Sequence, residues 1–476
     1  MVDGPNAFSY VGFSASRAKR GSALPRRTVI VGGGAAGLGS AGGVKAADPD
    51  ADVVVYTQYE DVAYSPCGIP YVHGGEIDDF QKLFLAGKQA YVDAGIDVRY
   101  NTEVTAIDKA RASITVAGEG EGEGEVRYDQ LIIATGFDYA DPGVPGGDLD
   151  GLYYVKNIRE AMEWDKVLDT VKQAVVVEAS PLGLEMVTSL AHRGIETHLI
   201  DPNPWALAEM ADPDIMAPVE ESWREMGVTL HFNTSLEAFL GEGKLRAVKT
   251  SAGELPADLA VVCTHKTPNN ALAAAAGLKI GSTGGIIVDE RMATSADGVF
   301  AAGDCTEIPH GFTGVPLQGL TGSHAYAQGK VAGTNAGGGS RAYRAVYVPW
   351  GTVAGKWVIG GASFGETTAT ALGIPHVVAQ ADGISRARYY PGVHKIKVKL
   401  IAEPGTLRLI GAQMVGGGEG IKERADFLAM AVKFGFTLHD LSTMENVYSP
   451  PIGALNEPIV VAATNGVNAL AKTKRG

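Results

Sequence analysis

The residue in this sequence best suited to redox chemistry is Cys67, which lies in the stretch Tyr64–Tyr71 about thirty residues beyond a cluster of glycines. A thiolate can exchange an electron pair with a disulfide or with the ring system of a flavin. The third and fifth residues after Cys67 are Pro70 and Val72, which excludes a closely spaced redox-active cysteine pair. A helix beginning just after Cys67 would lower the pKa of its thiol, whereas the alternative is a buried, inert cysteine.

Composition limits the classes of protein to which the chain could belong. Its 476 residues include 63 glycines and are 45% hydrophobic, which predicts several α/β domains with many tight turns. The net charge of -14 argues against nucleic acid or an anionic membrane as the main partner, and no long apolar run predicts a membrane span. Three cysteines indicate a cytoplasmic location, with Cys263 and Cys305 structural. Residues 1–25 are interpreted as a flexible extension, and no metal site is predicted.

A dinucleotide-binding turn is predicted after the short strand Thr28–Val31. Gly32, Gly34 and Gly37 match the pattern G-x-G-x-x-G between a strand and a helix, where backbone amides can bind a pyrophosphate. The next strand ends at Thr57, where an acidic residue would usually bind the ribose. Thr57 can still form one hydrogen bond, and Gln58 or Glu60 could share the task.

A second nucleotide-binding unit is predicted from the strand Ala174–Val177, but its glycine pattern is reduced to Gly183. Glu178 would bring a carboxylate to a pyrophosphate, and Ser180 adds bulk where the backbone should approach it. In favour of a nicotinamide nucleotide are Asp201, suited to an unphosphorylated ribose, and Glu185, near the expected carboxamide. The sequence therefore leaves NADH binding open and favours NADH over NADPH.

The first nucleotide-binding domain is predicted to contain three further segments. Residues 101–133 are predicted to form a β meander whose acidic tract 118–124 is a solvated hairpin tip. The meander ends in a buried strand that runs into Thr135 and Gly136. After the second domain, a strand ending in Gly303 and Asp304 could place a carboxylate on a ribityl hydroxyl.

From about residue 344 the composition indicates an α+β module, with a strand at 395–400 and a helix at 422–434. Two turns in it combine tyrosine with proline, one containing Tyr389 and Tyr390 and the other Tyr448. Without further context, tyrosines that cap surface turns are the simpler interpretation.

Together these motifs resemble the single-cysteine branch of the pyridine nucleotide-disulfide oxidoreductases, most of all coenzyme A disulfide reductases and NADH-dependent polysulfide reductases. The resemblance implies an α/β fold of two Rossmann-like domains, for FAD and NAD, and a C-terminal α+β dimerisation domain. It implies that Cys67 faces the flavin and that Tyr448 and Tyr390, or equally Tyr389, come from the partner subunit of a homodimer. The chain departs from the family at Pro181, where relatives have an aromatic residue over the flavin.

The predicted domains are 1–25 (extension), 26–147 and 277–343 (FAD binding), 148–276 (NAD binding-like) and 344–476 (dimerisation). The predicted catalytic residues are Cys67, Tyr448 and Tyr390. The predicted cofactor-binding residues are Gly32, Gly34, Ala36, Gly37, Thr57, Ser65, Thr135, Gly136, Gly183, Glu185, Asp201, Gly303 and Asp304.

The resemblance implies FAD-dependent reduction of a small disulfide or polysulfide, with coenzyme A disulfide as a candidate substrate and NADH as donor. One alternative is an NADH oxidase or peroxidase in which Cys67 cycles through a sulfenic acid. Another is an electron-transfer flavoprotein that has lost its nucleotide site and serves a protein redox partner.

Overall fold

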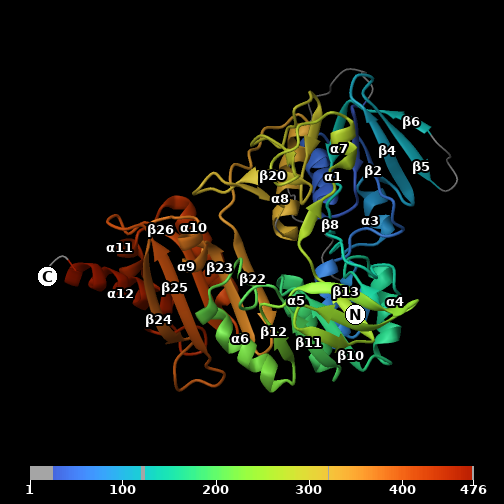
Figure 1. Cartoon of the computed structure of the whole chain (residues 1–476). Helices are drawn as coiled ribbons and strands as arrows, with labels where there is room; N and C mark the ends of the chain where they lie inside the picture. Colours follow the sequence, from blue (N-terminus) through green and yellow to red (C-terminus); the bar gives the residue numbers. More distant parts are fainter. Residues whose placement is uncertain (1–24, 119–123, 320, 474–476) are drawn as a thin grey trace. The chain divides into compact units, whose positions relative to one another are not determined.

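The computed structural model describes residues 25–118, 124–319 and 321–473, which form two compact units of mixed helix and strand (Figure 1). Residues 1–24 of the predicted extension and residues 119–123 of the predicted hairpin tip lie outside the described residues. Unit 1 comprises the chain up to Pro66, Asp79–Ala140 and Lys266–Val346. Unit 2 comprises Cys67–Asp78, Asp141–His265 and the chain from Tyr347.

Unit 1 is built on a parallel sheet in the order β19-β7-β1-β2-β3. These strands are β1 (Arg27–Val31), β2 (Asp52–Tyr56), β3 (Ile96–Arg99), β7 (Gln130–Ile133) and β19 (Val299–Ala301). The β-branched and aliphatic residues of β1, β2 and β7 are buried almost throughout, as expected for a parallel sheet covered on both faces.

Two helices of unit 1, α1 (Ala35–Ala47) and α8 (Gly322–Ala336), pack closely on one another (Figure 1). Glycines make the approach possible. A Cβ atom on Gly329 would overlap the carbonyl oxygen of Ala36, and one on Gly333 would overlap that of Ser40. The small residues that follow the first glycine turn therefore bring α1 into backbone contact with α8.

The rest of unit 1 consists of small sheets and short helices. The predicted meander is present as an antiparallel sheet whose strands are paired in sequence order. The elements are η2 (Phe80–Leu83), α3 (Lys88–Asp93), β4 (Thr102–Asp108), β5 (Ser113–Gly118), β6 (Gly124–Arg127), β8 (Phe137–Tyr139), β17 (Lys266–Pro268), α7 (Ala271–Ala275), β18 (Ile286–Ile287), β20 (Thr306–Pro309) and β21 (Pro316–Gln318).

Unit 2 contains a second parallel sheet in the order β12-β11-β10-β16-β9. Its strands are β9 (Leu152–Tyr153), β10 (Gln173–Val177), β11 (Glu196–Ile200), β12 (Thr229–His231) and β16 (Leu259–Val262). With it belong the short helices η1 (Pro66–Gly68) and α2 (Ile69–His73), the helices α4 (Ile158–Leu168), α5 (Pro181–His192) and α6 (Pro213–Glu225), and an antiparallel sheet of β13 (Leu236–Glu242), β14 (Lys244–Thr250) and β15 (Gly253–Pro256).

The C-terminal part of unit 2 is an antiparallel sheet in the order β22-β23-β26-β25-β24 with four helices. The elements are β22 (Pro349–Ala354), β23 (Trp357–Ser363), α9 (Glu366–Ala371), β24 (Val377–Ile384), β25 (Lys395–Ala402), β26 (Leu409–Gly416), α10 (Ile421–Phe434), α11 (Leu438–Ser442) and α12 (Pro458–Thr473). The strand and helix predicted from about 395 and 422 are thus β25 and α10. Gly435, at a φ of 73°, ends α10.

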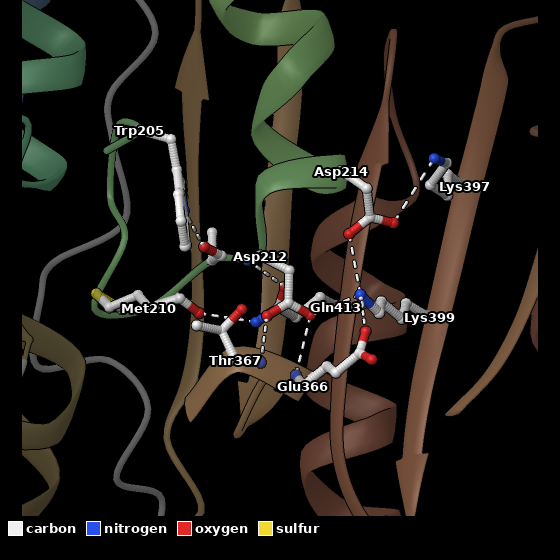
Figure 2. A network of polar contacts seen from close by, with 10 residues as sticks. Trp205, Met210, Asp212, Asp214, Glu366, Thr367, Lys397, Lys399 and Gln413 are labelled. Atoms are coloured by element: carbon white, nitrogen blue, oxygen red, sulfur yellow. Dashed lines mark hydrogen bonds and ion pairs between the residues drawn. The ribbon is translucent and has the colours of Figure 1, made fainter. Parts of the chain in front are cut away.

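The two faces of β25 have different partners, as its alternating side chains require. Val398 and Leu400 join the apolar core under α10 and α12. Lys399 points to the other face, where its ammonium group pairs with Asp212 at 3.0 Å, Asp214 at 2.9 Å and Glu366 at 2.6 Å (Figure 2). This network, in which Lys399 and Asp212 are buried, fixes the start of α6 to the C-terminal sheet.

Among the described residues, no helix combines the length and the apolar character needed to cross a membrane. In the same part of the chain, no group of three or more His, Cys, Asp or Glu residues could hold a metal ion.

Candidate active site

The first glycine turn, between β1 and α1, has the geometry of a dinucleotide site. Gly32 has a φ of 113°, and a Cβ atom on it would overlap the carbonyl oxygen of Ala134. A Cβ atom on Gly37 would overlap the carbonyl oxygen of Gly32, so the fold itself requires both glycines. A Cβ atom on Gly34, the N-cap of α1, would meet nothing within 4 Å.

The start of α1 therefore offers open space and backbone donors. Gly34 makes no side-chain cap, and the first turn of α1 contains Ala35 and Ala36 and no acidic residue. The first N–H groups of a helix lack partners within it and favour negative charge. The turn fits the pyrophosphate of a dinucleotide such as FAD.

The other residues predicted for this cofactor lie within unit 1, where several of them form hydrogen bonds. Thr57 is buried at the end of β2, where its hydroxyl oxygen accepts from the amide of Tyr59 at 3.3 Å. Thr135 donates its hydroxyl proton to the carbonyl of Asn269 at 2.6 Å. Gly136 has a φ of 71°. The amide of Ser65 donates to the carbonyl of Leu83 in η2 at 2.9 Å. Their roles toward the cofactor stay predictions.

Asp304 follows β19 and Gly303, whose φ is 86°. Its carboxylate is nearly buried and pairs with the ammonium group of Lys266 at 3.0 Å. Lys266 was missed from the sequence because it lies 38 residues away at the start of β17. The pair neutralises and orients the carboxylate that is predicted to bind a ribityl hydroxyl.

The three cysteines lie in different environments. Cys67 is exposed, whereas Cys263 and Cys305 are buried. Burial raises the pKa of the Cys263 thiol, helped by the charge of Glu178, and burial raises the pKa of Cys305 as well. Both buried thiols therefore stay protonated and unreactive. As predicted, a helix begins directly after Cys67, but α2 has only five residues.

Two sets of polar contacts hold α2 in place within unit 2. At its middle, the Tyr71 hydroxyl donates to Glu185 at 3.2 Å, and the Thr352 hydroxyl donates to the same oxygen at 2.9 Å. Burial raises the pKa of Glu185. Glu185 thus already supports the helix that follows Cys67, and its predicted contact with a carboxamide stays a prediction.

At the end of α2, buried His73 contacts Asp165 through Nδ1 and the Tyr153 hydroxyl through Nε2, both at 3.1 Å. Arg193 donates to the backbone carbonyl of His73 and to Asp165. These contacts explain why Cys67–Asp78 belongs to unit 2, although the sequence analysis placed it within the first domain.

Among the three tyrosines of the proline turns, Tyr389 and Tyr448 lie together, with their hydroxyl oxygens 3.2 Å apart. Their hydrogen bond raises the pKa of Tyr448. All three side chains are exposed, and the amide of the predicted Tyr390 donates to the carbonyl of Ala387. Sequence spacing could not choose between adjacent tyrosines, and the geometry favours Tyr389.

The second turn, between β10 and α5, differs from the first. Glu178 has a φ of 71°, a backbone that favours glycine. Burial and the charges of Asp201 and Glu209 raise the pKa of Glu178 to about 7. Asp201 itself is buried and accepts the amides of Ala179 and Asn203, both at 2.7 Å. The second turn therefore lacks the open glycine backbone of the first.

Comparison with known proteins shows the family to which the chain belongs. Residues 26–330 match the family model for the pyridine nucleotide-disulphide oxidoreductases, and residues 352–457 match the dimerisation domain of the same family. The chain belongs to this family. The predicted family is therefore confirmed, as are two Rossmann-like domains followed by a dimerisation domain.

Relatives within the pyridine nucleotide-disulphide oxidoreductases span almost the whole chain. The chain is 33% identical to an NADH oxidase of Methanocaldococcus jannaschii, over 93% of this chain and 99% of that protein. It is 32% identical to an NAD(P)H coenzyme A polysulfide/persulfide reductase of Pyrococcus horikoshii, over 93% and 99%.

Solved structures give the same result. An NAD-dependent persulfide reductase from A. fulgidus superposes with a TM-score of 0.89 at 32% identity, over 94% of this chain and 83% of that one. An FAD-dependent pyridine nucleotide-disulphide oxidoreductase from Desulfovibrio vulgaris superposes with a TM-score of 0.75 at 26% identity, over 94% and 100%. The prediction of an FAD-dependent oxidoreductase is confirmed at the level of the family.

Proposed function

We propose that the protein is an FAD-dependent reductase of a small disulfide or polysulfide that acts through Cys67. The observation that carries the proposal is the exposed thiol of Cys67 at the start of α2, while both other cysteines are buried and inert. The names of the relatives support this chemistry, because several act on sulfur compounds that contain or require coenzyme A. We propose a coenzyme A disulfide or persulfide as the substrate.

FAD is the cofactor that the first glycine turn would hold. Gly32, Gly34 and Gly37 would present the start of α1 to the pyrophosphate, and Asp304 would bind the ribityl chain. When bound, FAD supplies the electron pair that splits a mixed disulfide on Cys67 into two thiolates.

The chemistry of the chain itself is thiol–disulfide exchange. The Cys67 thiolate attacks one sulfur of the substrate, an S–S bond forms to Cys67, and the other half of the substrate leaves as a thiolate. Tyr448 donates a hydrogen bond to that leaving thiolate. Because the ordinary pKa of a tyrosine is about 10, the phenol keeps its proton at neutral pH, and the thiolate is protonated by water.

The dimerisation domain supports a homodimer as the working assembly. We propose that the Tyr389–Tyr448 pair serves the Cys67 site of the partner subunit. The low cysteine content supports a cytoplasmic location. Pyridine nucleotide is the reductant in the family, but a protein electron donor stays an alternative, because the second nucleotide turn lacks the open glycine backbone of the first.

The test is to replace Cys67 with serine and to supply electrons without any nucleotide. The holoenzyme is reduced photochemically in the absence of air and mixed with coenzyme A disulfide, and flavin reoxidation and thiol release are recorded. Wild type should release thiol as the flavin reoxidises, whereas Cys67→Ser should lose both by roughly a hundredfold or more and keep its FAD. Cys263→Ala is the matched control, since its thiol is buried. Undiminished thiol release by Cys67→Ser would refute the proposal.

A flavin-dependent oxidase is a second candidate, supported by the NADH oxidase of M. jannaschii. In that reaction Cys67 would become a sulfenic acid when it reduces peroxide, with release of water. Oxygen consumption and thiol release by the reduced enzyme separate the two candidates. Thiol release that outpaces oxygen consumption supports the disulfide reductase.

A further inference from the structure

We infer that the turn between β10 and α5 is closed to a dinucleotide pyrophosphate by its own side chains, so that NADH binds this protein weakly. This inference concerns the reductant of the proposed FAD-dependent reductase, and it rests on the proposed function only in taking NADH as the candidate electron donor. It is carried by a comparison between two turns of one chain.

The backbones of the two turns correspond. Gly32 follows β1 and donates its amide to Tyr56 at the end of the neighbouring strand, and Glu178 follows β10 and donates its amide to Ile200 in the same way. Both residues have positive φ angles. A Cβ atom on Gly183 would overlap the carbonyl oxygen of Glu178, as one on Gly37 would overlap that of Gly32. Gly183 is therefore explained by packing alone.

The helix N-termini differ in the donors that they offer. Helix α1 begins with Ala35 and has no side-chain cap. Helix α5 begins with Pro181, which has no N–H group. The amide of Gly183 is already bound to the Ser180 hydroxyl at 3.3 Å. Two of the backbone donors that a pyrophosphate would use are thus missing or occupied.

Charge at the second turn is also unfavourable. Glu178 occupies the position that Gly32 occupies in the first turn, so a carboxyl group stands where the first turn has no side chain. The negative charges of Asp201 and Glu209 lie close enough to raise the pKa of Glu178. The backbone amide of His265, which lies between β16 and β17, donates to Glu178. A phosphate approaching this turn meets negative charge, whereas the first turn of α1 has no acidic residue.

The ribose contact is lost for a separate reason. Asp201 stands at the end of β11, where a carboxylate would bind the ribose hydroxyls. Its Oδ2 accepts the amide of Ala179 and its Oδ1 accepts the amide of Asn203, both at 2.7 Å, and the residue is 4% exposed. The carboxylate holds the turn together and is not presented to a ligand.

The experiment restores the glycines and measures binding. The FAD-loaded protein is titrated by calorimetry with ADP-ribose, which contains the pyrophosphate and ribose but no nicotinamide. The air-free enzyme is then titrated with NADH, and flavin bleaching is followed. We expect wild type to bind ADP-ribose with a Kd of roughly 1 mM or weaker, and the Glu178→Gly/Ser180→Gly variant to bind both ligands roughly tenfold or more tightly.

Two further variants make the result decisive. Glu221→Gln removes one carboxylate from an exposed position of α6 and should leave both affinities unchanged. Ser180→Ala keeps the backbone and frees only the Gly183 amide, so it should tighten ADP-ribose binding a few-fold even if the double variant fails to fold. Micromolar binding of ADP-ribose by wild type, or no gain in folded Ser180→Ala, would overturn the inference. Neither outcome affects the Cys67 test, which uses no nucleotide.

Discussion

Glu178 combines a backbone conformation that favours glycine with a partly buried carboxyl group. Its φ of 71° is strained for a residue other than glycine. Its carboxyl group is partly buried near Asp201 and Glu209. These surroundings raise its pKa to about 7 from an ordinary value of 4.5. Between these two values the folded state binds more protons than the unfolded state. The contribution of Glu178 to the free energy of unfolding is therefore fully present below pH 4.5 and is lost as the pH rises through about 7.

We predict that Glu178→Gln raises the melting temperature more at pH 8 than at pH 5. The glutamine removes a partly buried charge that exists only at the higher pH. After allowance for solvent screening, the gain is about 1 kcal/mol at pH 8, or roughly 1–2 °C for a chain of this length. Thermal unfolding at both values measures it, with Glu221→Gln as the control for net charge. An equal shift at pH 5 and pH 8 would show that charge burial is not the cause.

At the scale of elements, the helix that follows Cys67 depends on its neighbours. Five residues are too few for a stable isolated helix, so α2 is held by tertiary contacts. Tyr71 connects α2 to Glu185 by a hydrogen bond, and His73 connects it to Asp165 and Tyr153 in the same way. The orientation of the Cys67 thiol is thus set by residues that are distant in the sequence.

We predict that Tyr71→Phe lowers kcat/KM for disulfide reduction by roughly fivefold while FAD content stays unchanged. The variant removes one hydrogen bond of about 1 kcal/mol and loosens α2. The rate at which iodoacetamide alkylates Cys67, measured by mass spectrometry, should also change by up to roughly fivefold. Tyr326→Phe, at an exposed tyrosine of α8, is the matched control. An unchanged alkylation rate together with unchanged turnover would show that Tyr71 does not position the thiol.

At the scale of the whole molecule, the segment that contains Tyr448 carries several exposed apolar residues. Val447, Ile452 and Leu455 are 78%, 67% and 69% exposed, and Tyr448 lies among them in the sequence. They belong to a segment that the dimerisation-domain match includes. Exposed apolar residues concentrated in one segment are typical of a protein interface. We therefore expect the site proposed around Cys67 to depend on assembly.

We predict that Ile452→Asp combined with Leu455→Asp shifts the protein from dimer to monomer and abolishes disulfide reduction. Two carboxylates cannot be buried in an apolar interface without a large penalty. Sedimentation measures the assembly, and flavin absorbance verifies that each subunit still holds FAD. Leu372→Asp, at an exposed position just after α9, should leave the dimer intact. A fully active monomer would contradict the role of the partner subunit.

Much of this organisation follows from short sequence patterns. The glycines after β1, the β-branched strands and Cys67 are local signals, because each is required by the backbone geometry or chemistry of its own turn. The contacts of Lys266 with Asp304, of Tyr71 with Glu185 and of Lys399 with Asp212 join positions separated by many residues. No local pattern marks them.

The amino-acid sequence by itself determined the family and the fold class, because these depend on motifs whose residues lie next to one another in the chain. Only the tertiary structure decided that Tyr389 rather than Tyr390 meets Tyr448, and that Asp201 is used by its own turn. Both outcomes depend on the direction in which a side chain points and on what already occupies its hydrogen-bonding atoms. Folding fixes these directions and contacts by bringing distant segments together.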